Sequence, residues 1–214
     1  MTGFRIVPHP PGVAAGIRER FRDIDAATIG HLTDRGYLAS LRPLFTPIRL
    51  FGPAVTVRTP AFCGAVIREA LIAARAGDVL VIETVGDRGR ACWGELRTLA
   101  ALRKGLAGVV VAGAVTDSRA IRDLGFPVFS IGISAITTRG GGQEGEVNVS
   151  LDLDGVRVEA GDLILGDEDG VFSISAISAP SLSEAAARRA ADESRQRLRL
   201  KAWDRDNRQA SCVK

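Results

Sequence analysis

The sequence contains very few of the side chains that carry nucleophilic or zinc-dependent catalysis. Only two of its 214 residues are histidines. His9 lies in a proline-rich leading segment, and His31 lies in a helical pattern over residues 26–38, where a structural or surface role is typical. A Ser-His-Asp triad or a histidine-rich zinc site therefore has little material from which to be built.

Cysteines and lysines are equally sparse. The chain has three of each, which are Cys63, Cys92, Cys212, Lys104, Lys201 and Lys214. Scattered cysteines fit a reducing cytoplasm better than a disulfide scaffold. The lysines lie at a predicted helix end and in the tail, so we do not expect a buried Schiff-base lysine. Catalysis would then depend on carboxylates, arginines, backbone amides and a hard metal ion.

Long apolar runs and nucleotide-binding motifs are also absent. No stretch approaches the roughly 18 apolar residues of a membrane span. The first residues lack the apolar core of a signal peptide. Neither the GxGxxG fingerprint nor a Walker A motif occurs. We expect a cytoplasmic protein that binds no membrane.

The net charge of +3 is concentrated in the tail. Residues 181–214 hold nine Arg or Lys and five Asp or Glu, a local excess of +4, so the remainder carries −1. Only Trp203 accompanies these charges, whereas nucleic-acid binding favours a basic stripe with several stacking aromatics. We therefore expect no nucleic-acid partner and interpret the tail as a solvated helix face or a subunit contact.

The middle of the chain alternates between helical and strand patterns. The spacing predicts helices over 13–22, 26–35, 64–75, 93–104 and 117–124, and strands over 52–58, 79–83, 108–112 and 127–131. Strands that alternate with helices in this order predict right-handed crossovers and a parallel sheet.

The pattern changes after residue 136. A glycine-rich loop spans 137–145, and alternating residues 147–153 lead through Asp154-Gly155 into 156–158, which predicts a hairpin. The residues Ala160-Gly161-Asp162 repeat the earlier sequence Ala76-Gly77-Asp78, and we interpret this repeat as two uses of the same turn structure. A long Arg-rich helix is expected over 183–203. We predict one α/β domain over 1–180 and a C-terminal helical arm, 181–214, which packs on that domain or on a neighbouring subunit.

The most informative segment is Gly86–Asp117. It begins with a glycine-rich turn and brings two acids, Glu95 and Asp117, to the ends of different elements. Ligands of α/β folds collect at strand tips and helix starts, and hard divalent cations prefer oxygen ligands. The segment therefore predicts a small-molecule site with a possible metal. On pattern alone, capping of its own helix is the favoured role of Asp117.

An ordered set of short runs resembles the RraA-like family. The runs are GDVLVIE, WGE, GLAGVVVAGAVTD and GFPVFSIG, with LRPLFTPIRLFGPAVTV before them and EGEVNV and AGDLILGDEDGV after them. The family contains class II 4-hydroxy-4-methyl-2-oxoglutarate aldolases, which often also decarboxylate oxaloacetate, and the non-enzymatic ribonuclease E regulator RraA. The resemblance implies a β/β/α fold related to swivelling phosphohistidine domains, and homotrimers or hexamers with sites at subunit interfaces.

The resemblance also implies functional residues. Asp117 matches the aspartate that holds Mg²⁺ or Mn²⁺ in the aldolases. Gly94, Glu95, Leu96 and Arg97 match the acid and the backbone amides that receive the substrate. Glu95 and Asp117 are thus the expected catalytic pair of a metal-dependent lyase acting on a small 2-oxo acid, since cleavage or decarboxylation of such an acid generates an enolate that a cation stabilises.

One departure from the family pattern affects substrate binding. Thr116 stands where the aldolases have an arginine, so bidentate carboxylate binding is lost at that position and Thr116 is expected to contact the substrate instead. Three explanations are open. In the first, another arginine binds the substrate carboxylate, and the candidates are Arg90, Arg97, Arg119 and Arg139. In the second, the chain is a lyase or isomerase with a different substrate. In the third, it is a non-catalytic regulator of the RraA type.

Overall fold

A parallel sheet forms the centre of the molecule. The computed structural model describes residues 3–140 and 142–211, with side chains as far as Lys201. Four parallel strands make the sheet: β3 (Leu50–Pro60), β4 (Val79–Val85), β5 (Gly108–Val115) and β6 (Val128–Ile133). The expected strands are thus confirmed, although each extends beyond its expected range.

Short strands continue the sheet at both sides. β7 (Glu146–Val147) pairs with β3, and β1 (Arg5–Ile6) pairs with β7. On the other side, β2 (Arg42–Pro43) pairs with β6, which gives the order β1-β7-β3-β4-β5-β6-β2. The prediction of a single strand over 147–153 is wrong. Asn148 has a left-handed φ of 59°, which ends β7, and a separate strand, β8 (Leu151–Leu153), begins three residues later.

A second β layer packs behind this sheet. β10 (Leu163–Asp167) and β11 (Gly170–Ile174) form a hairpin, and β10 also pairs with the first residues of β3, so β3 belongs to both layers. β8 forms the expected hairpin with β9 (Val156–Val158). Asp154 and Gly155 both have positive φ, as a tight two-residue turn requires.

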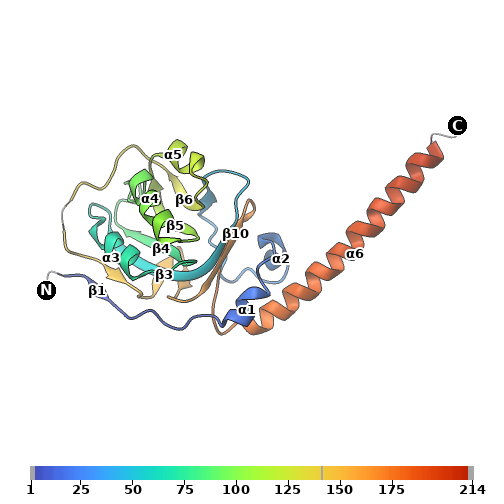
Figure 1. The fold of residues 1–214 in the computed structure, drawn as a ribbon, viewed down its shortest axis with the longest axis horizontal. Helices are drawn as coiled ribbons and strands as arrows, with labels where there is room; N and C mark the ends of the chain where they lie inside the picture. Colours follow the sequence, from blue (N-terminus) through green and yellow to red (C-terminus); the bar gives the residue numbers. More distant parts are fainter. Residues whose placement is uncertain (1–2, 141, 212–214) are drawn as a thin grey trace.

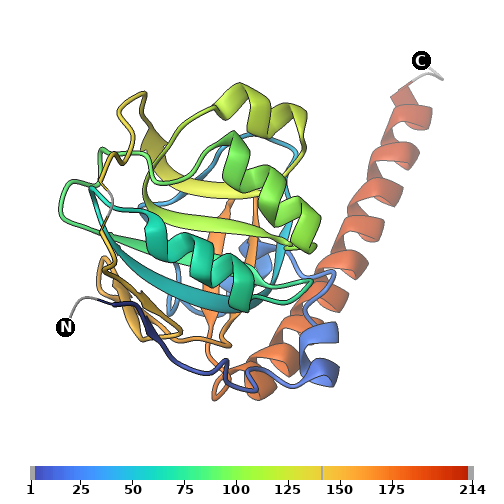
Figure 2. The same cartoon turned by 60° about the vertical axis from the view of Figure 1, so that its left-hand side comes forward.

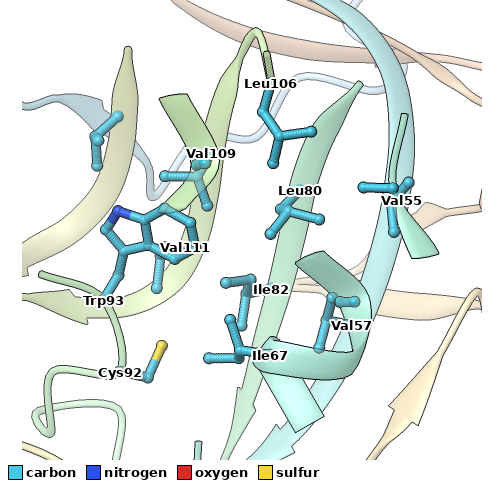
Figure 3. Packing of buried hydrophobic residues seen from close by; sticks show 14 of the residues in the cluster. Val55, Val57, Ile67, Leu80, Ile82, Cys92, Trp93, Leu106, Val109 and Val111 are labelled. Atoms are coloured by element: carbon cyan, nitrogen blue, oxygen red, sulfur yellow. The ribbon is translucent and has the colours of Figure 1, made fainter. Parts of the chain in front are cut away.

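Three helices cover the other face of the parallel strands. Figures 1 and 2 show α3 (Ala65–Ala73), α4 (Glu95–Lys104) and α5 (Ser118–Asp123) together on that face. Their apolar sides and the strands enclose a core of aliphatic residues around Leu80, Ile82 and Val111 (Figure 3). The chain is thus layered as β/β/α, and α4 and α5 both begin at the carboxyl edge of the sheet.

The two Ala-Gly-Asp turns have the same geometry. In each, the glycine has a φ of 85°. The carboxylate of Asp78 accepts a hydrogen bond from the amide of Arg75 at 2.7 Å, and that of Asp162 accepts one from the amide of Glu159 at 3.0 Å. The prediction that the two segments form the same turn structure is confirmed.

The helices near the N-terminus are shorter than expected. α1 is Ala15–Glu19 and α2 is Ala26–Gly30, against predictions of 13–22 and 26–35. After α2 the chain turns at Gly36, which has a left-handed φ of 84°, and Tyr37 then pairs with Phe172 of β11 in a β-bridge.

The final helix is longer than expected and projects from the body. α6 spans Ala179–Ser211, and Figure 1 shows most of it extending away from the domain. Its beginning packs, through the buried Ala179, Ser183 and Ala186, against α1 and α2. Among the described residues no helix is both long and apolar enough to cross a membrane.

Candidate functional site

The loop before α4 is attached to the end of β5. Trp93 forms a parallel β-bridge with Val115, and the amide of Thr116 donates to the carbonyl of Trp93 at 2.8 Å. This pairing places the first residue of α4, Glu95, beside Asp117, although 22 positions separate them in sequence. The two acids that the sequence singled out are therefore brought together.

Asp117 does not cap its own helix. It occupies the N-cap position of α5, but its side chain makes no capping hydrogen bond there, and its φ of 55° and ψ of 35° are left-handed. Its Oδ2 atom instead accepts the amide of Glu95 at 2.9 Å. The expectation of an own-helix N-cap is thus wrong, because the carboxylate is turned toward α4. Aspartate is among the few non-glycine residues that adopt this conformation, and residues held in it are often found at functional sites.

Gly94 makes this approach possible. A Cβ at position 94 would lie 2.5 Å from Asp117 Oδ2 and 2.8 Å from Thr116 Cγ2, both shorter than real contacts. The glycine of the WGE run is therefore required for space, since its φ of −160° is accessible to any residue. Gly94 thus fixes the distance between the end of β5 and the start of α4.

A hollow of about 510 Å³ opens at this point. It is lined by Glu95, Asp117, Ser118, Arg119, Ala120 and Asp123. Three carboxylates and one guanidinium therefore face a common space. The sequence analysis did not predict Ser118 or Asp123 as site residues. The four-residue spacing of Arg119 and Asp123, which places both on one side of a helix, was the one pattern that could have indicated Asp123.

The first turn of α4 presents amide groups beside Asp117. Gly94 provides no side-chain cap, and the first N–H groups of a helix have no partner within the helix. The amide of Glu95 is used by Asp117, while the described residues offer no acceptor to the amides of Leu96 and Arg97. Such amides, at the positive end of a helix dipole, are suited to an anionic group such as a carboxylate.

The arginines expected to compensate for Thr116 are placed very differently. Arg97 is turned away and donates to the carbonyl of Gly64 at 3.0 Å, where burial lowers the pKa of its guanidinium. Arg90 lies 3.3 Å from Asp87 and contacts the carbonyl of Thr137. Arg139 is exposed in the glycine-rich loop.

Arg119 is the candidate that lines the hollow. Of the four arginines that the sequence allows, it alone shares a space with Asp117 among the described residues. Thr116 itself is half-buried, and its hydroxyl lies 3.4 Å from Asp117 Oδ1, a long contact. Thr116 therefore leaves that oxygen largely free.

Trp93 serves packing. Its ring is buried and stacks on Phe126 with ring centroids 6.2 Å apart, and its indole N–H donates to Thr98 Oγ1 at 2.9 Å. Figure 3 shows the ring beside Val111 within the core. The buried ring of Trp93 is therefore not available to stack on a ligand.

The donor set at Asp117 fits a hydrated divalent cation. The described residues contain no group of three or more His, Cys, Asp or Glu placed to enclose a metal. Mg²⁺, however, keeps several water ligands and is commonly held by one or two carboxylates. Asp117 Oδ1 is exposed to the hollow and weakly engaged, so the residues present are compatible with an ion bound through one carboxylate and water.

Known proteins resemble this chain in sequence. The family model described as RraA-like, Aldolase/RraA, matches residues 24–172. A protein of Halalkalibacterium halodurans, provisionally named a 4-hydroxy-4-methyl-2-oxoglutarate aldolase, is 35% identical over 181 residues, or 83% of this chain and 86% of that protein. A Thermus thermophilus protein named 4-hydroxy-4-methyl-2-oxoglutarate aldolase is 36% identical over 109 residues, or 50% of this chain and 65% of that protein.

Solved structures resemble it in fold. Streptomyces coelicolor RraAS2, described as an unusual member of the RNase ES inhibitor RraA family, matches with a TM-score of 0.77 over 88% of this chain and 99% of that one, at 24% identity. The RNA-processing inhibitor RraA from Thermus thermophilus matches with a TM-score of 0.58 over 63% of this chain and 81% of that one, at 31% identity. The expected β/β/α fold with a C-terminal helix is thereby confirmed.

Proposed function

Because this chain belongs to the RraA-like family, we propose that it is a divalent-metal-dependent carbon–carbon lyase acting on a small 2-oxo acid. One observation carries the proposal. The Asp117 carboxylate is turned away from its own helix, bonded through one oxygen to α4, and open at the other toward a hollow with free helix amides beside it.

Asp117 would hold Mg²⁺ or Mn²⁺ through Oδ1, with water completing the coordination. The ion would supply Lewis acidity to the C2 carbonyl of the 2-oxo acid, and so would stabilise the negative charge that develops when the bond between C3 and C4 breaks. The Glu95 amide keeps the Asp117 carboxylate in one orientation, since it donates to Oδ2 at 2.9 Å. The chain thus contributes a carboxylate whose position is set before a ligand binds.

The remaining residues would bind and orient the substrate. The amides of Leu96 and Arg97, at the positive end of α4, donate to the carboxylate next to the oxo group. The Glu95 carboxylate lines the same hollow and accepts a hydrogen bond from a substrate hydroxyl or from water. The Thr116 hydroxyl donates a single hydrogen bond where an arginine would donate two.

The test is pyruvate release from 4-hydroxy-4-methyl-2-oxoglutarate and from oxaloacetate, with and without Mg²⁺ or Mn²⁺. Asp117→Asn retains an acceptor for the Glu95 amide but removes the charge. We expect it to lower kcat/KM by about a hundredfold or more, the scale at which one preorganised electrostatic group acts. Asp123→Asn, which changes another carboxylate of the hollow, is the matched control. Undiminished turnover by Asp117→Asn contradicts the metal role.

A second candidate is a regulatory protein of the RraA type. It is favoured by the 31% identity to an RNA-processing inhibitor, whereas the retained Asp117 argues against it. This candidate predicts stoichiometric binding to ribonuclease E, with inhibition, and no metal-dependent turnover. A pull-down with purified ribonuclease E beside the pyruvate assay separates the two functions. A lyase or isomerase with another substrate would show metal-dependent binding of a 2-oxo acid without pyruvate release.

A further inference from the structure

The guanidinium of Arg97 lies half-buried between the starts of α3 and α4. Arg97 is the third residue of α4, and its Nη2 atom donates to the carbonyl of Gly64, the N-cap residue of α3, at 3.0 Å. A Cβ at position 64 would lie 2.5 Å from that nitrogen, so the glycine leaves the space that the guanidinium fills. The side chain is therefore held where the two helices meet.

The fold does not balance the charge of Arg97. Among the residues that the structure describes, no carboxylate forms an ion pair with it, and the ionisable side chains that its charge meets are the buried thiols of Cys92 and Cys63. One carbonyl accepts a hydrogen bond from a side chain that has five N–H donors. Burial accordingly lowers the pKa of the guanidinium, which means that the folded chain disfavours this charge.

The hydrogen bond to Gly64 is not required by its acceptor. The carbonyl of Gly64 also accepts the amide of Ile67 at 3.2 Å, within the first turn of α3. Loss of the Arg97 side chain would therefore leave no carbonyl without a partner at this place. A partly buried charge that has no counter-ion in the described part of the fold indicates an anionic ligand as its counterpart.

The free amides of α4 lie at the end of the helix toward which Arg97 extends. A long helical side chain is directed back toward the N-terminus, which is where the amides of Leu96 and Arg97 lack acceptors. α3 begins beside α4, with neither a side-chain cap nor an acidic residue in its first turn. The positive ends of two helix dipoles and one guanidinium thus converge, while the acids of this end, Glu95 and Asp117, line the hollow.

We propose that Arg97 is a positioning residue for the substrate: its charge strengthens the binding of a 2-oxo acid carboxylate by the α4 amides, although its guanidinium does not contact that carboxylate. The inference rests on the proposed function for the identity of the ligand. Arg97 is turned away from the hollow, so it acts through the first turn of α4. It thus supplies, from the far side of that turn, positive charge of the kind that Thr116 does not provide.

The experiment is calorimetric titration, in Mg²⁺, of pyruvate and of pyruvamide, which is the uncharged amide of the same acid. The proteins are wild type, Arg97→Met, Arg97→Lys and Arg103→Met. Arg103 is exposed in the last turn of α4, so its variant removes an equal charge from the opposite end of the same helix. The melting temperature of each ligand-free protein is measured beside the titrations.

We expect the wild type to bind pyruvate more tightly than pyruvamide. The ratio of the two affinities should fall about fivefold in Arg97→Met, the effect of one unit charge acting through partly solvated protein. It should be largely retained in Arg97→Lys and unchanged in Arg103→Met. The melting temperature of Arg97→Met should stay the same or rise by about 2 °C, since an apolar side chain in place of a buried charge is commonly neutral or stabilising.

A purely structural role for Arg97 gives the opposite pattern. The melting temperature of Arg97→Met would then fall, and its affinities for pyruvate and pyruvamide would fall by equal factors. Either this pattern or an affinity ratio that is unchanged in Arg97→Met overturns the inference.

Failure of the proposed function gives a different result. If the affinity ratio depends on Arg97 but no substrate releases pyruvate, the binding assignment stands and the lyase reaction fails. If pyruvate is released and the ratio does not depend on Arg97, the lyase stands and Arg97 only fills the space between α3 and α4.

Discussion

At the residue scale, the site depends on close approach between the chain before α4 and the end of β5. Gly94 and Asp117 meet at this approach. Gly94 has no side chain, which leaves room for the Asp117 carboxylate, and Asp117 has a left-handed φ. The Asp117 carboxylate satisfies a backbone donor in the first turn of α4, so the two residues together define how the end of β5 meets this helix.

Gly94→Ala should separate Asp117 from α4. The added Cβ would lie 2.5 Å from Asp117 Oδ2, so the carboxylate must move and its hydrogen bond to the Glu95 amide must lengthen. We expect turnover to fall about tenfold or more, as a misplaced group of this kind costs. Gly16→Ala, where a Cβ meets open space, is the control. Normal turnover by Gly94→Ala would show that Asp117 tolerates displacement.

The pH dependence of stability should show an acid limb from the Arg88–Asp154 pair. The guanidinium of Arg88, 2.7 Å away, lowers the pKa of Asp154 to about 2. A lowered pKa means that the stabilisation is complete above the unfolded value of about 4 and is lost as pH falls toward 2. Both side chains are over a third exposed, so we expect less than about 1 kcal/mol at neutral pH.

The measurement is the difference in melting temperature between wild type and Asp154→Asn from pH 2 to pH 7. Asparagine tolerates the left-handed φ of 56° at this turn, so the change isolates the charge. The difference should be constant above pH 5 and vanish near pH 2. A difference that persists unchanged at pH 2 would show that the ion pair is not its cause.

At the element scale, the start of α4 is held by a buried side-chain relay. Thr98 Oγ1 accepts the indole N–H of Trp93 and donates to the carbonyl of Gly94 at 3.0 Å. The relay joins the core, the first turn of the helix and the glycine that contacts Asp117. The orientation of α4, and with it the direction of its free amides, is therefore set by packing behind the site.

Thr98→Val keeps the shape of the side chain but removes both hydrogen bonds. The indole N–H of Trp93 is then buried without a partner, which costs about 1–3 kcal/mol. Urea unfolding followed by tryptophan fluorescence measures this loss. Thr33→Val, which removes a side-chain hydrogen bond at a partly exposed turn, should cost less. Equal losses in the two variants would contradict the relay.

At the scale of the whole molecule, apolar surface remains uncovered on the helical layer. Leu99 and Leu102 of α4 are 43% and 40% exposed, and Ile72 of the neighbouring α3 is 57% exposed. Exposed apolar groups gathered on adjacent helices often mark a protein–protein contact. We therefore predict that copies of the chain associate through this layer, as the family resemblance implies for trimers or hexamers.

Native mass spectrometry measures the assembly directly. The double variant Leu99→Glu, Leu102→Glu places charges in the predicted contact and should reduce the assembly to smaller species. Arg103→Glu, on the same helix and already charged, should leave the mass unchanged. A wild-type monomer at micromolar concentration would contradict the prediction.

Much of this architecture is determined locally and could therefore be predicted from the sequence. Continuous apolar runs predicted the first five residues of β4 and of β5, because both strands are buried on both faces, and helical spacing predicted α4 with a start two residues too early. The two Ala-Gly-Asp turns were recognisable because a glycine at positive φ and an aspartate that caps a backbone amide are local requirements. The tail helix, by contrast, was underestimated at both ends.

The main helices and strands, and the pair of acids at their ends, follow from local patterns along the chain. The contacts of those acids depend on the fold. Pairing of Trp93 with Val115 carries Asp117 to α4, away from the helix that it was expected to cap, and directs Arg97 toward Gly64 while Arg119 lines the hollow. The physical reason is that helices and turns follow from neighbours along the chain, whereas the direction of a side chain at a strand end depends on which distant backbone lies beside it.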